Sequence, residues 1–213
     1  MRCEFDHLVV TAPTLAAGAA WVEQSLGVAP GPGGEHPRMG TYNRLLRLGE
    51  SCFVEVLAID PAAARPARPR WFGLDELAPD ATPRLTAWVA RTDDLRACPA
   101  ALLQEAGEIE PMTRGTREWL ITIPPDGGLP LGGALPAFIE WQSPPAPAGA
   151  GLPDAGCALA GLGLRHPQAA HLHELLGLAG LADAVAIGTG TPGLWADIVT
   201  PSGLRRLGPR ATS

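Results

Sequence analysis

The feature that most constrains the fold of this chain is an internal repeat. A shift of 80 residues places Val9 on Val89 and Gly27 on Gly107. Both stretches combine an apolar strand-like run, a polar turn and an amphipathic helix that ends at the glycine. The chain is therefore expected to form at least two copies of one small unit rather than a single unrelated succession of elements.

Each copy is predicted to have the order strand, helix, strand, strand, strand. In the first copy, two apolar runs joined by a hairpin turn follow the helix within residues 42–59. The last strands of the two copies are also similar, since residues 53–56 read Phe-Val-Glu-Val and residues 138–141 read Phe-Ile-Glu-Trp. We therefore predict an α+β protein with paired βαβββ modules at residues 3–60 and 84–143.

The C-terminal part, residues 157–207, follows the same pattern less closely. A shift of 150 residues places Val9 on Leu159 and Gly27 on Gly177. Short segments rich in Gly, Ala and Leu also align by chance, so two interpretations stay open. The segment is either a third, βαβββ-like extension or a tail unrelated to the repeat.

Charge and composition argue against several classes of function. All 16 basic residues are arginines, so the chain has no Schiff-base lysine and no phosphate-loop lysine. The formal net charge of −6 argues against a nucleic-acid partner or an anionic membrane. No stretch reaches the roughly 18 apolar residues of a membrane span, and the acidic first residues do not resemble a signal peptide. With four scattered cysteines, typical of reduced thiols, we expect a cytoplasmic protein with a small-molecule or structural role.

Three side chains form the best candidate set of metal ligands: His7, His36 and Glu55. Imidazole and carboxylate groups suit borderline divalent ions. His7 lies on the predicted first strand and Glu55 on the last strand of the first module. A carboxylate within an apolar strand is costly to bury unless a cation or hydrogen-bond donor meets it, and Glu140 raises the same question. The alternative is that these residues are solvated or hydrogen-bonded on half-exposed strands.

Candidate substrate contacts lie close to these residues in the predicted modules. Arg114 and Arg117 precede the apolar run that begins at Trp119, and an arginine that faces a cavity can bind a carboxylate in a bidentate manner. Asn43 can donate a hydrogen bond to a ligand or stabilise a turn. We select Asn43, Arg117 and Trp119 as candidate substrate-binding residues. The alternative for at least one of the two arginines is a solvated strand edge.

Two other motifs are not expected to carry chemistry. His171 and His173 lie two residues apart on a predicted helix and therefore point to different faces. The stretch 188–193 has the letters of a GxGxxG motif, but Pro192 and a strand-like run follow it where a helix should begin. We therefore expect surface histidines, a turn and no nucleotide cofactor.

The chain resembles a glyoxalase-like domain of the vicinal-oxygen-chelate superfamily, which includes glyoxalases, bleomycin-resistance proteins and dioxygenases. The resemblance rests on residues 5–10, on the signature at 33–43, on the closing strand at 53–56, and on residues 117–123 and 131–141 of the second module. It covers residues 4–143, and the stretch from His36 to Asn43 is its most specific part.

The resemblance implies paired modules whose sheets curl around a cleft, and a homodimer. Family members often hold a divalent ion in the cleft with His, Gln or Glu from the first and last strands of each module. Here His7, Glu55 and Glu140 match three of those positions, and the resemblance implies Zn, Ni, Mn or Fe as the ion. The fourth position is Ala87, which cannot bind a metal, so His36 is expected to act as a substitute ligand, a base or a substrate contact.

We therefore expect a metal-dependent enzyme that binds two oxygens of a small substrate and acts as a lyase, isomerase or oxygenase. His36 and Glu140 are its candidate catalytic residues, and Arg117 is expected to orient an anionic group. The alternative is a non-catalytic protein on the same scaffold that sequesters a small molecule, which the six tryptophans and Ala87 favour. A structural or regulatory interaction module is a third class.

Overall fold

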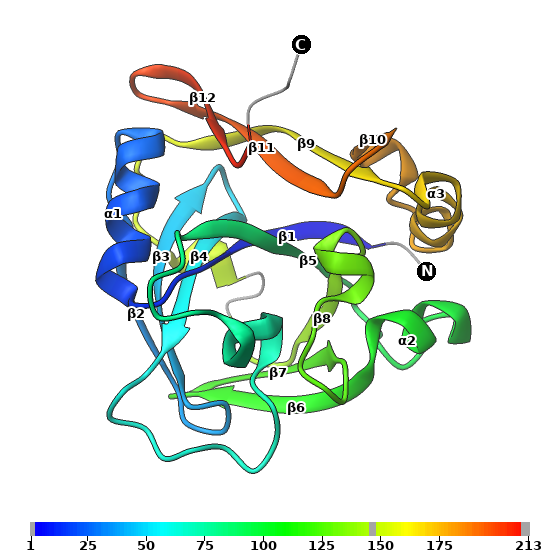
Figure 1. Ribbon diagram of the computed structural model, residues 1–213, viewed down its shortest axis with the longest axis horizontal. Helices are drawn as coiled ribbons and strands as arrows, with labels where there is room; N and C mark the ends of the chain where they lie inside the picture. Colours follow the sequence, from blue (N-terminus) through cyan, green and yellow to red (C-terminus); the bar gives the residue numbers. More distant parts are fainter. Residues whose placement is uncertain (1–2, 145–147, 210–213) are drawn as a thin grey trace.

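The computed structural model describes residues 3–144 and 148–209, which form two β-sheets with helices packed against them (Figure 1). The larger sheet has eight strands and is strongly curled, and the smaller one has four. The α+β class and the curled mixed sheet confirm the predicted fold class. The strands of the larger sheet are β1 (Glu4–Thr11), β2 (Gly31–His36), β3 (Thr41–Leu48), β4 (Cys52–Ile59), β5 (Arg84–Arg91), β6 (Glu108–Arg114), β7 (Arg117–Ile123) and β8 (Ala137–Trp141).

The eight-stranded sheet contains the order strand, helix and three strands twice. Its strands lie in the order β2-β3-β4-β1-β5-β8-β7-β6. In each half the first and last strands pair in parallel, β1 with β4 and β5 with β8. The two halves join through the antiparallel pair of β1 and β5. The order of elements that the repeat predicts is therefore present in both halves.

Helix α1 (Leu15–Leu26) follows β1, and α2 (Ala100–Ala106) occupies the same place after β5. The hydroxyl of Thr14 caps the first turn of α1, and Gly27 ends it in the left-handed region at φ 75°, a conformation that favours glycine. Its buried residues Val22 and Leu26 face the larger sheet. None of the helices in residues 3–144 and 148–209 is both long and apolar enough to cross a membrane.

The two faces of the curled sheet pack against different sets of side chains. Because side chains alternate along a strand, Val9 on β1 and Val89 on β5 lie in a buried cluster on the inner face. Their neighbours Leu8 and Trp88 lie in a second cluster under the helices. Trp88 is fully buried, and its indole N–H donates a hydrogen bond to the backbone carbonyl of Ala134 at 3.0 Å. The inner face therefore has its own buried cluster, separate from the core that lies under the helices.

Ion pairs bridge the far edges of the curled sheet. Arg38, which follows β2, pairs with Glu110 on β6, the strand at the opposite edge. Arg68, from the segment after β4, places its Nη1 2.6 Å from the other oxygen of Glu110. The curl therefore brings β2 and β6 near one another, so that the inner face encloses a space between the two halves.

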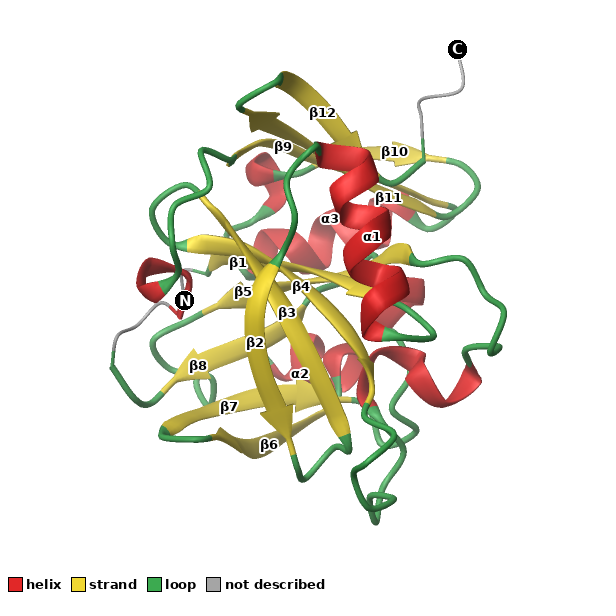
Figure 2. Ribbon diagram, turned by 90° about the vertical axis from the view of Figure 1, so that its left-hand side faces the viewer, coloured by secondary structure: helices red, strands yellow, loops and turns green. Residues whose placement is uncertain are grey.

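The C-terminal segment repeats the order strand, helix and three strands in the smaller sheet, which covers one side of the larger sheet (Figure 2). Leu164 and Ile198 of this sheet share one apolar cluster with Leu26 and Trp88. This element order favours the βαβββ-like extension over an unrelated tail, whereas the boundaries 3–60, 84–143 and 157–207 stay predictions. The elements are β9 (Ala158–His166), α3 (Ala169–Leu178), β10 (Ala186–Thr189), β11 (Gly193–Thr200) and β12 (Gly203–Leu207), with strand order β10-β9-β11-β12.

Candidate functional site

A group of buried polar side chains interrupts the apolar inner face, and we call it the inner cluster. Its members are all less than one-tenth exposed. They come from the four strands of the first half of the sheet, where neighbouring strands present them to the same space. The inner cluster consists of Asp6 and His7 on β1, His36 on β2, Asn43 on β3 and Glu55 on β4.

His7 is held between two carboxylates. Its Nδ1 lies 2.6 Å from Oδ1 of Asp6, and its Nε2 lies 3.6 Å from Oε2 of Glu55. Consecutive side chains normally point to opposite faces of a strand, but the pairing of β1 with β5 shifts register between Phe5 and His7. Asp6 is the extra residue of this bulge, and the shift lets its carboxylate reach the neighbouring imidazole. Nδ1 of His7 therefore faces Asp6, and its Nε2 faces Glu55.

His36 approaches the same carboxylate from the other side. Its Nδ1 lies 3.2 Å from Oγ1 of Thr41, and its Nε2 lies 3.9 Å from Oε1 of Glu55. Burial lowers the pKa of His36 to about 4, although the negative charge of Glu55 acts in the opposite direction. The imidazole is therefore neutral at pH 7. The edges of Trp71 and Trp119 contact it at ring-centre distances of 5.1 and 6.0 Å.

Asn43 links the carboxylate to a basic side chain. Its Nδ2 donates to Oε1 of Glu55 at 2.5 Å, and its Oδ1 accepts from the backbone N–H of Gly34 at 2.8 Å. Nη1 of Arg114, on β6, donates to the same Oδ1 at 3.1 Å. A Cβ atom at Gly33 would lie 2.1 Å from that oxygen, so only glycine allows this approach. The hydrogen bond from Asn43 offsets part of the free-energy cost of burying the carboxylate of Glu55.

The inner cluster opens into a small cavity whose other walls are aromatic. The cavity measures about 30 Å³, which is room for about one water molecule or one ion. Phe72 adopts φ 56°, a conformation rare for a side chain of its size, within the short turn η1 (Trp71–Glu76). The lining side chains outside the inner cluster are Phe53, Trp71, Phe72, Arg114, Trp119, Ile121, Ile139 and Trp141.

The structure brings five of the candidate residues named from the sequence to this cavity. They are His7, His36, Asn43, Glu55 and Trp119.

Two other candidates lie elsewhere. The lining residues Ile139 and Trp141 leave Glu140 on the other face of β8, where its Oε2 accepts a hydrogen bond from the backbone N–H of Leu95 at 2.8 Å. Arg117 does not line the cavity and holds its guanidinium 5.9 Å from the ring centre of Trp141. Neither side chain lines the cavity, so the structure does not bring Glu140 or Arg117 together with the other candidate residues.

Sequence reasoning did not select several residues that the fold places here. Asp6 gave no signal, because adjacent residues on a regular strand do not meet and only the bulge joins it to His7. Arg114 was considered with Arg117, but the spacing alone could not decide which of them faces the cavity. Trp71 lies in the connector between the halves, a segment whose composition predicted only a loop.

The donor chemistry of the inner cluster fits a divalent cation, although the side chains do not form a closed ligand shell as they lie. Within residues 3–144 and 148–209, no group of three or more His, Cys, Asp or Glu side chains has the spacing of a metal site. Two ligands of one ion, each at about 2.1 Å, are about 3.0–3.4 Å apart. The separations of 3.6 and 3.9 Å between the imidazole nitrogens and Glu55 lie above this range, by about 0.2 and 0.5 Å. His7 faces Oε2 of Glu55 and His36 faces Oε1, so one ion would bind all three side chains only after they move.

Comparison with known proteins gives one sequence family. The model of the family described as "Glyoxalase-like domain" matches residues 5–179 of the chain. No curated protein matches the sequence. The match extends past the second half of the larger sheet to the end of helix α3, so it includes every residue of the inner cluster.

Solved structures provide further matches. The chain is similar to a hypothetical protein from Staphylococcus aureus, with 15% sequence identity and a TM-score of 0.58, covering 100% of this chain and 88% of that one. It is also similar to a methylmalonyl-CoA epimerase from Mycobacterium tuberculosis, with 17% identity, 64% and 85% coverage and a TM-score of 0.42. A methylmalonyl-CoA epimerase in complex with methylmalonyl-CoA and NH4+ shows 15% identity, 67% and 97% coverage and a TM-score of 0.43. At such identities the Staphylococcus aureus likeness concerns the fold alone.

Proposed function

The chain belongs to the glyoxalase-like domain family of the vicinal-oxygen-chelate superfamily, and from this premise we propose that it is a metal-dependent enzyme acting on a small oxygen-bearing molecule. One observation supports the proposal above all. Two imidazoles turn Nε2 toward one buried carboxylate, while Asp6 and Thr41 engage the Nδ1 atoms. In metal-binding histidines, a hydrogen bond made by the ring nitrogen that does not bind the metal fixes the tautomer and the ring orientation.

His7, His36 and Glu55 would hold the ion. Two imidazoles and one carboxylate are a common ligand set for Zn and for non-haem Fe(II), and imidazole also suits Ni. Three protein ligands leave coordination positions for two oxygens of a substrate. When bound, the ion would supply Lewis-acid stabilisation of negative charge that develops on those oxygens. The reaction would be that of a lyase, an isomerase or an oxygenase.

The residues around the ligands have separate tasks in this proposal. Asp6 orients His7, and Asn43 fixes one oxygen of Glu55 by donating to it. Arg114 brings a positive charge to the cavity, which favours an anionic group on the substrate. Because burial lowers the pKa of His36 to about 4, its imidazole is neutral at pH 7 and has a lone pair available for the ion.

The direct test is metal content. The purified protein is incubated with Mn(II), Fe(II), Ni(II) or Zn(II), desalted and analysed for its elements. We expect one ion per chain in the native protein and loss of that ion in the variant Glu55→Gln. His171→Gln changes a half-exposed histidine far from the inner cluster and serves as the matched control, with metal content unchanged. A native protein that retains none of the four ions would refute the proposal.

The aromatic walls favour a second function, the binding of a small aromatic molecule without turnover, for which the walls of the 30 Å³ cavity would have to move apart. Trp119 and Trp141 lie 5.5 Å apart between ring centres, and the hydrogen bond from Asn43 already occupies one oxygen of Glu55. Titration with aromatic carbonyl compounds, followed by tryptophan fluorescence with and without a chelator, separates the two functions. Quenching that is identical in both conditions, in a protein without bound metal, favours sequestration.

We also propose that the protein is a homodimer, as the family resemblance implies. Val199 on β11 and Leu204 on β12 are directly paired in the smaller sheet and are 46% and 66% exposed. Such an apolar pair on a sheet surface suits contact with a second copy. Light scattering during size exclusion measures the mass, and a value near 22.1 kDa instead of twice that mass would contradict the dimer.

A further inference from the structure

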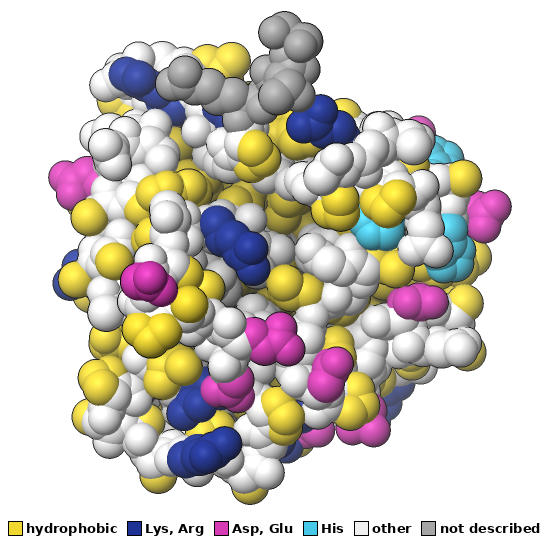
Figure 3. All heavy atoms as spheres, viewed as in Figure 1, with side chains coloured by type: hydrophobic (Ala, Val, Ile, Leu, Met, Phe, Trp, Pro, Cys, Tyr) yellow, Lys and Arg dark blue, Asp and Glu magenta, His cyan; other side chains and the backbone are white. Residues whose placement is uncertain are grey.

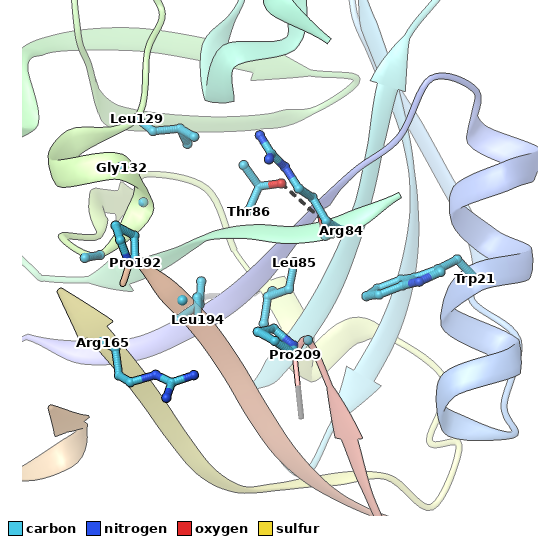
Figure 4. A pocket seen from close by; sticks show the side chains of 14 residues that line it. Trp21, Arg84, Leu85, Thr86, Leu129, Gly132, Arg165, Pro192, Leu194 and Pro209 are labelled. Carbon is cyan, nitrogen blue, oxygen red and sulfur yellow. Dashed lines mark hydrogen bonds between the residues drawn. The ribbon is translucent and has the colours of Figure 1, made fainter. Parts of the chain in front are cut away.

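A second and larger cavity lies between the two sheets, and we call it the inter-sheet cavity (Figure 4). It measures about 330 Å³ and shares no lining residue with the cavity at the inner cluster. Its walls come from the start of β5, from helix α1, from the turn η2 (Pro130–Gly133) and from β9 and β11 of the smaller sheet. Ligand sites frequently occupy such crevices between packed units, and volumes from about 300 Å³ are typical of them.

The charge of the inter-sheet cavity is entirely positive among the described residues. Arg84 on β5 and Arg165 on β9 are its two charged lining residues, and no Asp or Glu of residues 3–144 and 148–209 lines it. Arg84 is exposed and makes no ion pair within the described part of the chain. Figure 3 shows basic atoms among hydrophobic ones near the middle of this face. In a chain of net charge −6, an all-positive cavity is a local feature that favours an anion.

Apart from Thr86, the other side chains of the wall are apolar. Trp21 from helix α1 extends its ring toward the cavity, opposite the turn that contains Gly132 (Figure 4). A Cβ atom at Gly132 would meet nothing within 4 Å, and one at Gly193 would have no neighbour nearer than 3.9 Å. Leu194 is buried below. The small residues therefore leave room for an apolar group beside the tryptophan.

We propose that the inter-sheet cavity binds a small amphipathic anion, with its carboxylate at Arg84 and its ring or branched chain beside Trp21. A guanidinium matches a carboxylate with two parallel hydrogen bonds, and Arg165 adds positive potential from the opposite sheet. A volume of about 330 Å³ equals that of roughly eleven water molecules, which suits a ligand of about a dozen non-hydrogen atoms. This site is independent of the metal proposal, since the two cavities are lined by different residues.

Naphthoate tests the proposal, because it joins one carboxylate to an apolar double ring, and naphthamide is its uncharged counterpart. Binding is measured by isothermal titration calorimetry and by tryptophan fluorescence. We expect naphthoate to bind and naphthamide to bind at least about tenfold more weakly, since hydrogen bonds to a charged group contribute most of the difference. Arg84→Gln should lower the affinity for naphthoate by about tenfold as well.

Three further variants make the result specific. Gly193→Leu places a side chain in the cavity at a position without positive φ, and it should abolish binding. Arg44→Gln changes another exposed strand arginine, which does not line this cavity, and should leave the affinity unchanged. Arg114→Gln changes the inner cavity and should also leave it unchanged. Equal affinities for naphthoate and naphthamide, no binding at all, or a loss caused by Arg114→Gln instead of Arg84→Gln would overturn the proposal.

Discussion

Lowering the pH should destabilise this protein through His36. In the unfolded chain the imidazole has the ordinary pKa of 6.5, whereas burial lowers the pKa in the folded protein to about 4. Between these values the unfolded chain binds a proton that the folded protein does not bind. The free energy of unfolding should therefore fall as the pH decreases from about 6.5 to 4, and His36 should contribute no change above pH 7.

The size of the effect follows from the two pKa values. Each pKa unit corresponds to about 1.36 kcal/mol, so the contribution of His36 falls by about 2 kcal/mol at pH 5 and by about 3 kcal/mol at pH 4. No reduction for solvent screening applies, because the side chain is only 4% exposed. With a urea dependence of about 2–3 kcal/mol per M, the unfolding midpoint at pH 5 should be about 0.7–1 M lower on account of this one residue.

Urea unfolding of the native protein and of His36→Gln at pH 5 and 7.5 measures this contribution. Glutamine is similar in length, can still form a hydrogen bond with Thr41 and does not titrate. The variant should lose about 2 kcal/mol less than the native protein between the two pH values. Groups far from position 36 titrate alike in both proteins, so their effects cancel in the difference. Equal losses would show that His36 is not buried in its neutral form, and the reasoning from burial would be refuted.

Substitutions at three other positions test the packing and the inner cluster. Asp6→Asn removes the charge that orients His7 and should weaken Mn(II) binding at least about tenfold, as measured by calorimetry, whereas an unchanged affinity would exclude this orienting role. Gly133→Ala should destabilise the fold by at least about 2 kcal/mol, because the new Cβ would lie 2.1 Å from the backbone oxygen of Thr86 and because residue 133 has a φ of 90°. Thermal unfolding measures this loss, and a neutral result would contradict the close approach. Trp88→Ala should cost about 3–5 kcal/mol in urea unfolding, and Trp88→Phe clearly less; equal losses would mean that ring packing contributes little.

The repeat was sufficient to predict the element order in both halves of the larger sheet, whereas the curl around a cleft was implied by the family resemblance. Val9 and Val89, aligned by the shift of 80 residues, both lie in the inner-face cluster. His7 and Glu55, the candidate ligands from the first and last strands of the first module, line one cavity in the structure. Their roles as ligands stay predictions.

Glu140 shows where sequence similarity stops being informative. Phe-Val-Glu-Val and Phe-Ile-Glu-Trp look equivalent, but Phe53 faces the inner cavity whereas Phe138 lies in the cluster under the helices. When the two halves are superposed by their strand pairing, the two motifs are offset by an odd number of residues. Each side chain of the second motif therefore points to the opposite face of the sheet from its counterpart in the first. Glu140 consequently lies on the other side of the sheet from Glu55. Strand register depends on partner strands, and a single sequence does not contain that information.

The true counterpart of Glu55 can be taken from the strand pairing. Val9 on β1 pairs with Glu55 on β4, and Val89 on β5 pairs with Ala137 on β8. The second half therefore presents alanine at both positions that correspond to the ligands of the first half, since Ala87 already replaces His7. Within the described residues, the second half contributes mainly tryptophan and isoleucine walls and the guanidinium of Arg114 to the cavity.

This asymmetry determines how a substrate would bind. The proposed ligands His7, His36 and Glu55 all come from one half of the sheet, so the two substrate oxygens that bind the ion would face that half, whereas an anionic group would face Arg114 of the other half. The apolar part of the substrate must then lie against Trp119 and Trp141 of the other half. A symmetric pair of modules would offer ligands from both sides and allow two orientations. With the proposed ligands in one module only, a single orientation is favoured, because an apolar group at the inner cluster would leave the carboxylate of Glu55 only partly compensated by the hydrogen bond from Asn43.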